Sequence, residues 1–204
     1  ATVTFNITAP ANNEVVANGR LDHVATTTGN TRTWTFAEGV PIPPYCMIIA
    51  VGQFARLEPA QKALTPLSYY VPHSDSALAQ KGFAPAIPSL EFFTQTVAPY
   101  PYEKLALIVG ATRFGGMENS SAIVFTSNFF NRPATAALSK TYGIPAANVT
   151  LIAHEVAHQW WGNLVTCETW SDFWLNEGMV TFLAAAFKEH QWGRDEYDRE
   201  RTIA

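Results

Sequence analysis

The sequence contains little cysteine and no concentration of positive charge. Cys46 and Cys167 are its only cysteines, too few for a disulfide framework. Each lies in an apolar stretch, so we expect two buried free thiols. The net charge is -4 at pH 7, and Lys and Arg form no run. This excludes the charge pattern typical of proteins that bind nucleic acid or anionic membranes.

Long apolar runs are also absent. No stretch approaches the roughly 18 apolar residues of a membrane-spanning helix, and the first ten residues lack the features of a signal peptide. With 48% hydrophobic and 15% charged residues, we expect a soluble protein. The cytoplasm is favoured, and a periplasmic or secreted location stays open if a signal peptide precedes this stretch. The chain starts within an alternating pattern and ends inside a charged helical pattern around Arg201, so we expect a piece of a longer protein.

The first 57 residues have the pattern of β structure. Strands are predicted over 2–8, 31–36 and 45–51, with a turn at Asn18-Gly19. Five prolines between residues 58 and 88 predict an irregular stretch, with one short helix beginning near Ser74. We place a domain boundary in this stretch.

The rest of the chain alternates helices with buried strands. Helices are predicted over 89–97, 148–161 and 171–191, and strands over 105–109 and 122–126. Asn148 is the predicted N-cap of the second helix, and Gly162 and Gly193 are the predicted stops of the last two. The sequence therefore predicts an α+β protein.

The second of these helices contains His154-Glu155-Val156-Ala157-His158. Because a helix has 3.6 residues per turn, the two histidines lie on one face and can reach a single cation. Glu155 lies about 100° round the helix, where a base can take a proton from a water beside the metal. This pattern predicts a zinc site with Glu155 as general base.

A catalytic zinc takes three protein ligands and keeps one position open. Glu177 follows His158 after 18 intervening residues, almost two turns into the next predicted helix, and is the candidate third ligand. The alternative is an ordinary pair of helices, because an HExxH match arises by chance in about one chain in a hundred of this composition. A third ligand at this spacing argues against chance.

A second motif precedes the first: Gly115-Gly116-Met117-Glu118-Asn119. Two glycines allow close approach of a ligand, and a strand starting there at a sheet edge could pair with an extended peptide. Glu118 could then hold the peptide's N-terminal ammonium, which is how an aminopeptidase selects the first residue. Taken alone, the motif is more typical of an ordinary β-turn with an exposed Glu.

The two motifs together, with His-Gln-Trp-Trp-Gly-Asn-Leu-Val-Thr and Trp-Leu-Asn-Glu-Gly around the ligands, strongly resemble the gluzincin aminopeptidases. That family includes aminopeptidase N and the leukotriene hydrolase type. The resemblance extends over about residues 41–197 and is dense over 99–193; we expect a bacterial member. It implies one zinc ion held by His154, His158 and Glu177, with Glu155 as general base and then proton donor. It also implies that Glu118 anchors the substrate's ammonium group and that Asn176 is a partner of His158. The substrate strand would lie along Gly115, Gly116, Met117 and Asn119.

The resemblance also implies a domain organisation. Residues 1–57 correspond to the end of an all-β N-terminal domain. Residues 58–204 correspond to the first half of a thermolysin-like zinc metallopeptidase domain, with a mixed sheet, the HExxH helix and the Glu-bearing helix. The family's oxyanion tyrosine would fall beyond Ala204, a further ammonium-binding residue before Ala1, and the helical domain that closes the cavity is also outside this stretch.

We therefore expect a zinc-dependent aminopeptidase whose partner is a peptide with a free N-terminus. This stretch alone should have little or no activity. The oligomeric state and the preferred residue stay open. The alternatives are a leukotriene-type epoxide hydrolase, which would use the same zinc, and a non-catalytic zinc-stabilised binding module. Intact Glu155 and Glu118 argue against the latter for the parent protein.

Overall fold

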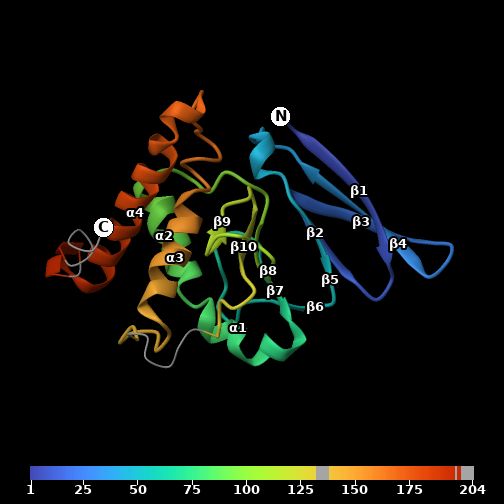
Figure 1. The fold of residues 1–204 in the computed structure, drawn as a ribbon, viewed down its shortest axis with the longest axis horizontal. Helices are drawn as coiled ribbons and strands as arrows, with labels where there is room; N and C mark the ends of the chain where they lie inside the picture. Colours follow the sequence, from blue (N-terminus) through green and yellow to red (C-terminus); the bar gives the residue numbers. More distant parts are fainter. Residues whose placement is uncertain (132–137, 196, 199–204) are drawn as a thin grey trace. The chain divides into compact units, whose positions relative to one another are not determined.

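A computed structural model describes residues 1–131, 138–195, 197 and 198 (Figure 1). The chain forms two compact units. The first contains Ala1–Gln80 and Pro101–Phe130, and the second contains Lys81–Tyr100 and Asn131–Ala204. All strands of the described residues belong to the first unit, and the three longest helices belong to the second. The predicted α+β class is confirmed, whereas the charged pattern around Arg201 lies outside the described residues.

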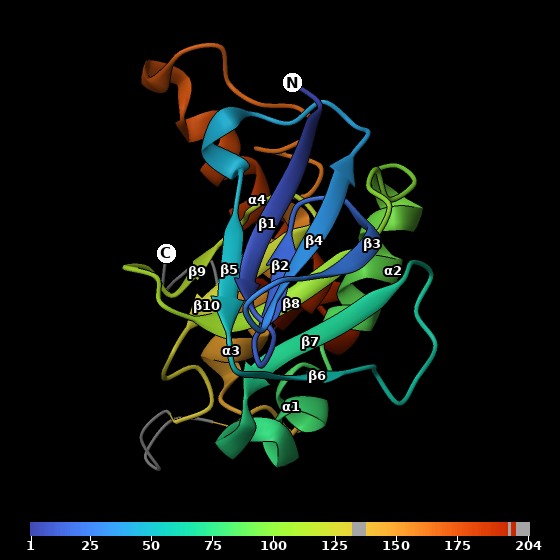
Figure 2. The same cartoon turned by 90° about the vertical axis from the view of Figure 1, so that its right-hand side faces the viewer.

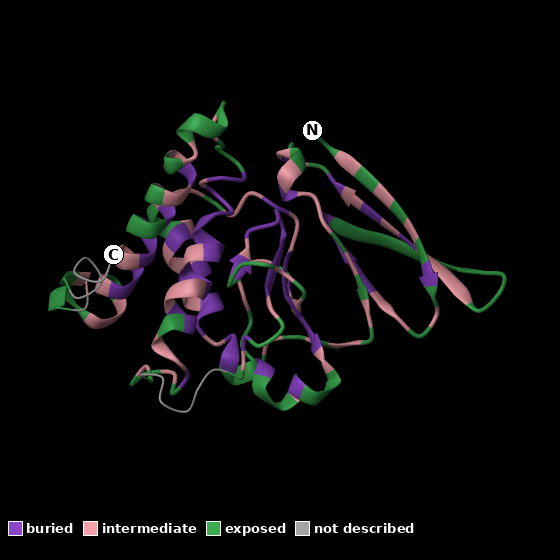
Figure 3. Cartoon of the chain, viewed as in Figure 1, coloured by how far each residue is buried: buried purple, intermediate pink, exposed green. Residues whose placement is uncertain are grey.

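A three-stranded antiparallel sheet is formed in the order β1 (Val3–Pro10), β4 (Thr31–Glu38) and β3 (Arg20–Thr27). The strands lie side by side in Figure 2. Trp34 and Phe36 of β4 are buried, while β3 is exposed along its whole length (Figure 3). The sheet therefore has a core on one side only.

A two-stranded ribbon lies between this sheet and a larger one. It pairs β2 (Glu14–Ala17) with β5 (Ile49–Gly52). Because side chains alternate along a strand, Val15 and Ala17 pack with Trp34 and Phe36, whereas Val16 packs with residues of the larger sheet. A short 3₁₀ turn, η1 (Pro44–Cys46), precedes β5, so the predicted strand over 45–51 is only half right.

The larger sheet has five strands, in the order β6 (Phe54–Leu57), β7 (Leu67–Pro72), β8 (Leu105–Gly110), β10 (Ala122–Thr126) and β9 (Gly116–Met117). The three inner strands are parallel and the two edge pairs are antiparallel. The continuous apolar runs of β8 and β10 agree with strands buried on both faces.

The prediction of an irregular stretch over 58–88 is wrong for β7, an inner strand of this sheet. The prolines next to β7 lie at the ends of the strand, where they disrupt few of its hydrogen bonds. Pro66 precedes the strand, and its carbonyl accepts a hydrogen bond from the Leu105 N–H at 2.8 Å; Pro72 is the last residue. Prolines are tolerated at strand ends because few ladder N–H groups are required there. The predicted short helix is confirmed: η2 (His73–Asp75) leads into α1 (Ser76–Gly82).

In the second unit, α2 (Ala86–Thr96), α3 (Ala146–Ala157) and α4 (Trp174–Trp192) lie side by side (Figure 1). Aromatic rings pack between them: Phe93 of α2 is 5.9 Å from Trp160, in the turn after α3, and 6.3 Å from Phe187 of α4, measured between ring centroids. Burying such large rings stabilises the three-helix arrangement. Within the part of the chain that the structure describes, no helix is both long and apolar enough to span a bilayer.

Three boundaries of the helices α3 and α4 differ from prediction. Pro145, rather than Asn148, is the N-cap of α3, because a proline with fixed φ can start a helix. The helix ends at Ala157, and residues 158–160 tighten into turns. A 3₁₀ turn, η3 (Trp170–Asp172), replaces the predicted first turn of α4. The predicted stop at Gly193 is confirmed by its φ of 90°.

Candidate active site

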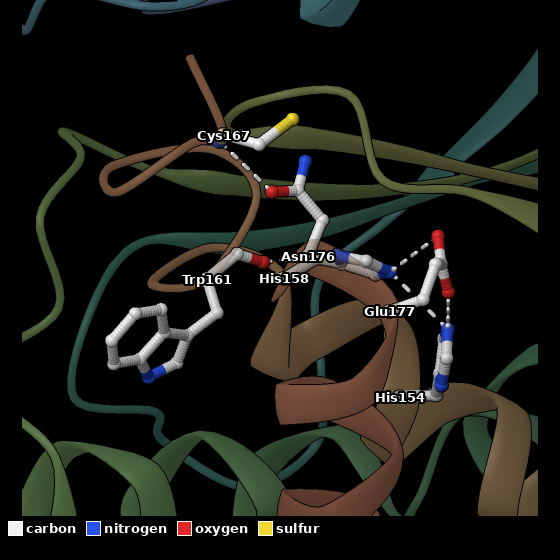
Figure 4. Close-up of polar contacts among 6 residues, drawn as sticks. All are labelled: His154, His158, Trp161, Cys167, Asn176 and Glu177. Atoms are coloured by element: carbon white, nitrogen blue, oxygen red, sulfur yellow. Dashed lines mark hydrogen bonds and ion pairs between the residues drawn. The ribbon is translucent and has the colours of Figure 1, made fainter. Parts of the chain in front are cut away.

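The three predicted ligands come together in the second unit (Figure 4). The Nε2 atoms of His154 and His158, one turn apart at the end of α3, are 3.2 Å from each other. Glu177 reaches both from α4. Its Oε2 is 3.2 Å from Nε2 of His154, and its Oε1 is 3.7 Å from Nε2 of His158. Glu177 lies in the first turn of α4, not almost two turns in as predicted, because η3 precedes the helix.

These distances fit a small divalent cation. Ligand bonds of about 2.1 Å in tetrahedral geometry place donor atoms about 3.4 Å apart. The three separations, 3.2, 3.2 and 3.7 Å, bracket this value. Two imidazoles and one carboxylate are a donor set of catalytic zinc, so the group has the chemistry and the size to hold such an ion.

The ring of His158 is oriented by a backbone carbonyl. Its Nδ1 lies 2.9 Å from the carbonyl oxygen of Trp161. A carbonyl only accepts hydrogen bonds, so we assign the proton to Nδ1, which leaves the lone pair of Nε2 directed at the site. Gly162 follows with a φ of 107°, and a Cβ there would be 2.8 Å from Nδ1. The sequence marked Gly162 only as a helix stop.

The site is charged and reachable. Hydrogen bonds to His154 and His158 hold the pKa of Glu177 well below its usual range, so the carboxylate is ionised. The side chain of His158 is 1% exposed, but that of Glu177 is 42% exposed. His158 thus lies on the buried side of the group and Glu177 on its exposed side, an arrangement that suits a site with an open coordination position.

Glu155 and Asn176 are both buried beside this group. Glu155 follows His154 directly on α3, about 100° round the helix from it, and does not belong to the group of His154, His158 and Glu177. The Oδ1 of Asn176 accepts a hydrogen bond from the Cys167 N–H at 3.1 Å, which ties α4 to the connection that follows α3. The proposed role of Asn176 as a partner of His158 stays a prediction.

Both cysteines are free thiols, as expected. Cys46 is buried, but Cys167 is only partly buried, so the prediction of burial is wrong for the second. Cys167 lies in the connection between α3 and α4 rather than in a helix core.

The glycine motif lies in the first unit. Gly116 and Met117 form β9, the predicted edge strand, which pairs with β10. Glu118 and Asn119 follow immediately and are 7% and 6% exposed. An ordinary turn with an exposed glutamate is therefore not what the chain forms here. A buried carboxylate at the end of an edge strand suits recognition of a charged group at the end of an extended ligand.

Comparisons with known proteins agree with the motifs. Residues 83–203 match the Peptidase family M1 domain. The chain is 32% identical over 206 residues to aminopeptidase N of Rattus norvegicus, which covers 93% of this chain and 20% of that protein. It is 33% identical over 191 residues to leucine aminopeptidase 2 of Aspergillus terreus, a match that covers 90% of this chain and 28% of that protein. It is 28% identical over 185 residues to glutamyl aminopeptidase of Rattus norvegicus, a match that covers 89% of this chain and 19% of that protein.

Proposed function

Because this chain belongs to peptidase family M1, we propose that its parent protein is a zinc-dependent aminopeptidase that removes the N-terminal residue from peptides. The observation that carries the proposal is the convergence of His154, His158 and Glu177 at metal-ligand distances. The chain spans only 19 to 28% of the length of the three relatives named above, so this activity is assigned to the parent.

In this proposal the three residues hold one zinc ion, which supplies Lewis acidity and an activated water when bound. Glu155 takes a proton from the attacking water and delivers it to the leaving amine. Glu118 holds the substrate's N-terminal ammonium. The backbone of Gly115, Gly116 and Met117 pairs with the substrate as an added strand, and Asn119 flanks this strand. The support from the fold is that β9 is the last strand in the order of its sheet, as far as the described residues show.

We also propose the domain organisation that the resemblance implies. Residues 1–57 would end an N-terminal β domain, and 58–204 would begin a thermolysin-like catalytic domain. Two features favour this assignment: β1 to β5 form sheets of their own within residues 1–57, and four of the five strands of the mixed sheet come after residue 57 and are followed by the two helices that carry the candidate ligands. The edge strand β6 (Phe54–Leu57) of the mixed sheet falls just before the proposed boundary.

The test uses the full-length parent and the substitution Glu155→Gln. Zinc content should be unchanged, because Glu155 is not a ligand, while kcat for a free aminoacyl substrate should fall by about 10²- to 10⁴-fold. Glu189→Gln, the same change at a partly exposed position on α4, is the matched control and should keep kcat. Full turnover by Glu155→Gln would overturn the assigned role.

The same assay separates the rival activities. The parent should refuse a peptide whose N-terminus is acetylated, because the acetyl group removes the ammonium that Glu118 is proposed to hold. Equal cleavage of blocked and free peptides would instead indicate an endopeptidase. Turnover of an epoxide without peptide cleavage would favour the leukotriene-type hydrolase.

A further inference from the structure

One buried amide in the first unit holds the backbone next to Glu118. Asn18, in the turn between β2 and β3, is 0% exposed. Its Nδ2 donates to the carbonyls of Cys46 at 2.9 Å and Ser120 at 2.6 Å, and its Oδ1 accepts from the Ile48 N–H at 2.7 Å. Both donors and the acceptor of this side chain are thus used on main-chain groups. Such fully satisfied buried amides fix geometry.

These bonds join two segments that also bind each other. The Ser120 N–H donates to the Cys46 carbonyl at 3.3 Å, and Asn119 Nδ2 lies 3.5 Å from the Met47 carbonyl. The stretch that follows Glu118 therefore lies along residues 46–48. Asn18 is hydrogen-bonded to both segments, so its amide sets the distance between them.

The residue after Ser120 has a backbone conformation that requires support from the Asn18 turn. Ser121 has a φ of 60°, a left-handed conformation that non-glycine residues keep only when their surroundings determine it. Its Oγ accepts from the Gly19 N–H at 2.8 Å and donates to Glu38 at 3.1 Å. The turn that carries Asn18 thus holds Ser121 as well. Gly19 itself has a φ of 78°, and a Cβ there would overlap the Ala37 carbonyl, so the turn has little freedom to move.

We propose that Asn18 is a positioning residue for the aminopeptidase reaction: its amide sets the backbone that presents Glu118 and thereby determines how strongly a substrate's ammonium is held. The inference rests on the proposed role of Glu118. A merely structural residue would change all ligand binding equally. A positioning residue of this kind changes only the share of the binding affinity that comes from the ligand's amino group.

The experiment compares two ligands on the full-length parent: an amino acid hydroxamate and the same hydroxamate without its α-amino group. Both compounds bind metal through the hydroxamate. The Kd of the des-amino compound divided by the Kd of the amino acid hydroxamate, both measured by calorimetry, therefore reports the amino-group contact alone. In Asn18→Ser this ratio should fall by about tenfold or more, since displacing an interacting group by about 1 Å costs large factors. Zinc content and the Kd of the des-amino compound should stay unchanged. Asn6→Ser, on the exposed part of β1, is the control and should match the parent.

Glu118→Ala is the reference that keeps the two proposals distinguishable. If it lowers the Kd ratio and Asn18→Ser does too, the positioning role is supported. If Glu118→Ala lowers the ratio and Asn18→Ser does not, the positioning role is overturned and the proposed function stands. If Glu118→Ala leaves the ratio unchanged, the anchor role fails, and the positioning role fails with it. Asn18→Asp, which keeps the size and the acceptor but loses both donors, is measured in parallel; loss of folding in both variants would mean a purely structural role.

Discussion

The two ring nitrogens of His158 make different contacts. Nδ1 donates to the Trp161 carbonyl, 2.9 Å away, and Nε2 faces Nε2 of His154 and a carboxylate oxygen of Glu177. Because a neutral imidazole carries one proton, fixing it on Nδ1 leaves Nε2 available as a ligand. The orientation of this candidate ligand thus depends on a main-chain atom, which no side-chain motif encodes.

The two cysteines should differ in reactivity. Alkylation requires an accessible thiolate. Burial, followed by the charge of Glu118, raises the pKa of Cys46 to about 12, so about one molecule in ten thousand carries this thiolate at pH 8. We expect iodoacetamide to modify Cys167 and to spare Cys46 in the folded parent, as measured by peptide mass mapping.

The control for this prediction is the same reaction in urea, where both thiols should be modified. The pH dependence has a defined sign. The folded pKa of Cys46 lies above its ordinary value of 9.0, so the stability that the buried thiol provides is present below pH 9 and is lost as the pH rises toward 12. Modification of both cysteines at equal rates at pH 8 would contradict the burial of Cys46.

At the scale of elements, the loop after α3 holds the site together. The Gly162 N–H donates to the Val165 carbonyl at 2.7 Å, the Val165 N–H to the Trp160 carbonyl at 2.9 Å, and the Asn163 N–H to the His158 carbonyl at 3.2 Å. This tight loop directs the Trp161 carbonyl at the His158 ring. It requires a positive φ at Gly162, which glycine adopts without steric cost.

Gly162→Ala should therefore weaken zinc binding. Its Cβ would lie 2.8 Å from Nδ1 of His158, and its φ of 107° is unfavourable for alanine. We expect zinc affinity to fall by about 10- to 100-fold, the usual effect of disturbing a residue that orients a metal ligand. The measurement is a competition titration of the parent against a chromophoric chelator.

Gly178→Ala is the matched control. This glycine lies in α4 directly after Glu177, and a Cβ there meets nothing within 4 Å. Zinc affinity should be unchanged, and the helix should gain up to about 1 kcal/mol from the replacement of glycine by alanine. Equal affinities for both variants would show that the Trp161 carbonyl does not govern the orientation of His158.

The sequence predicts elements better than their ends. The strands around residues 105–109 and 122–126 and the two ligand-bearing helices follow from apolar periodicity, and all four are present. The start of α4 differs from the predicted start because a 3₁₀ turn and the first turn of an α-helix have similar local patterns. The strand β7 is not predicted, because its flanking prolines are typical of a loop. It forms a strand through its pairing with β6 and β8, which local sequence does not show.

At the scale of the whole molecule, each compact unit is assembled from two separate stretches of chain. The sequence could predict His154 and His158 as candidate metal ligands, because they lie four residues apart on one helix. It could not predict that Asn18 bonds Ser120, 102 residues away, because a hydrogen bond between distant residues leaves no periodic signal. The same limit applies to the Trp161 carbonyl, since every residue has one.

The two units should respond differently to removal of zinc from the parent. The proposed ion links α3 to α4 through His154, His158 and Glu177, so its loss should loosen the ends of these helices. After chelation, we expect amide hydrogen exchange to accelerate about tenfold or more over residues 152–160 and 174–180. Exchange in β8 and β10 of the first unit should not change.

Re-addition of zinc should restore the slow exchange, and in Glu177→Ala it should have no effect, because one of the three links is absent. Each alternative result has a distinct meaning. Acceleration of equal size in β8 and β10 would indicate that the ion stabilises the chain as a whole rather than the helix pair. No change in either unit would indicate that the close approach of the two imidazoles and the carboxylate is maintained by helix packing alone, and that these residues do not form the zinc site.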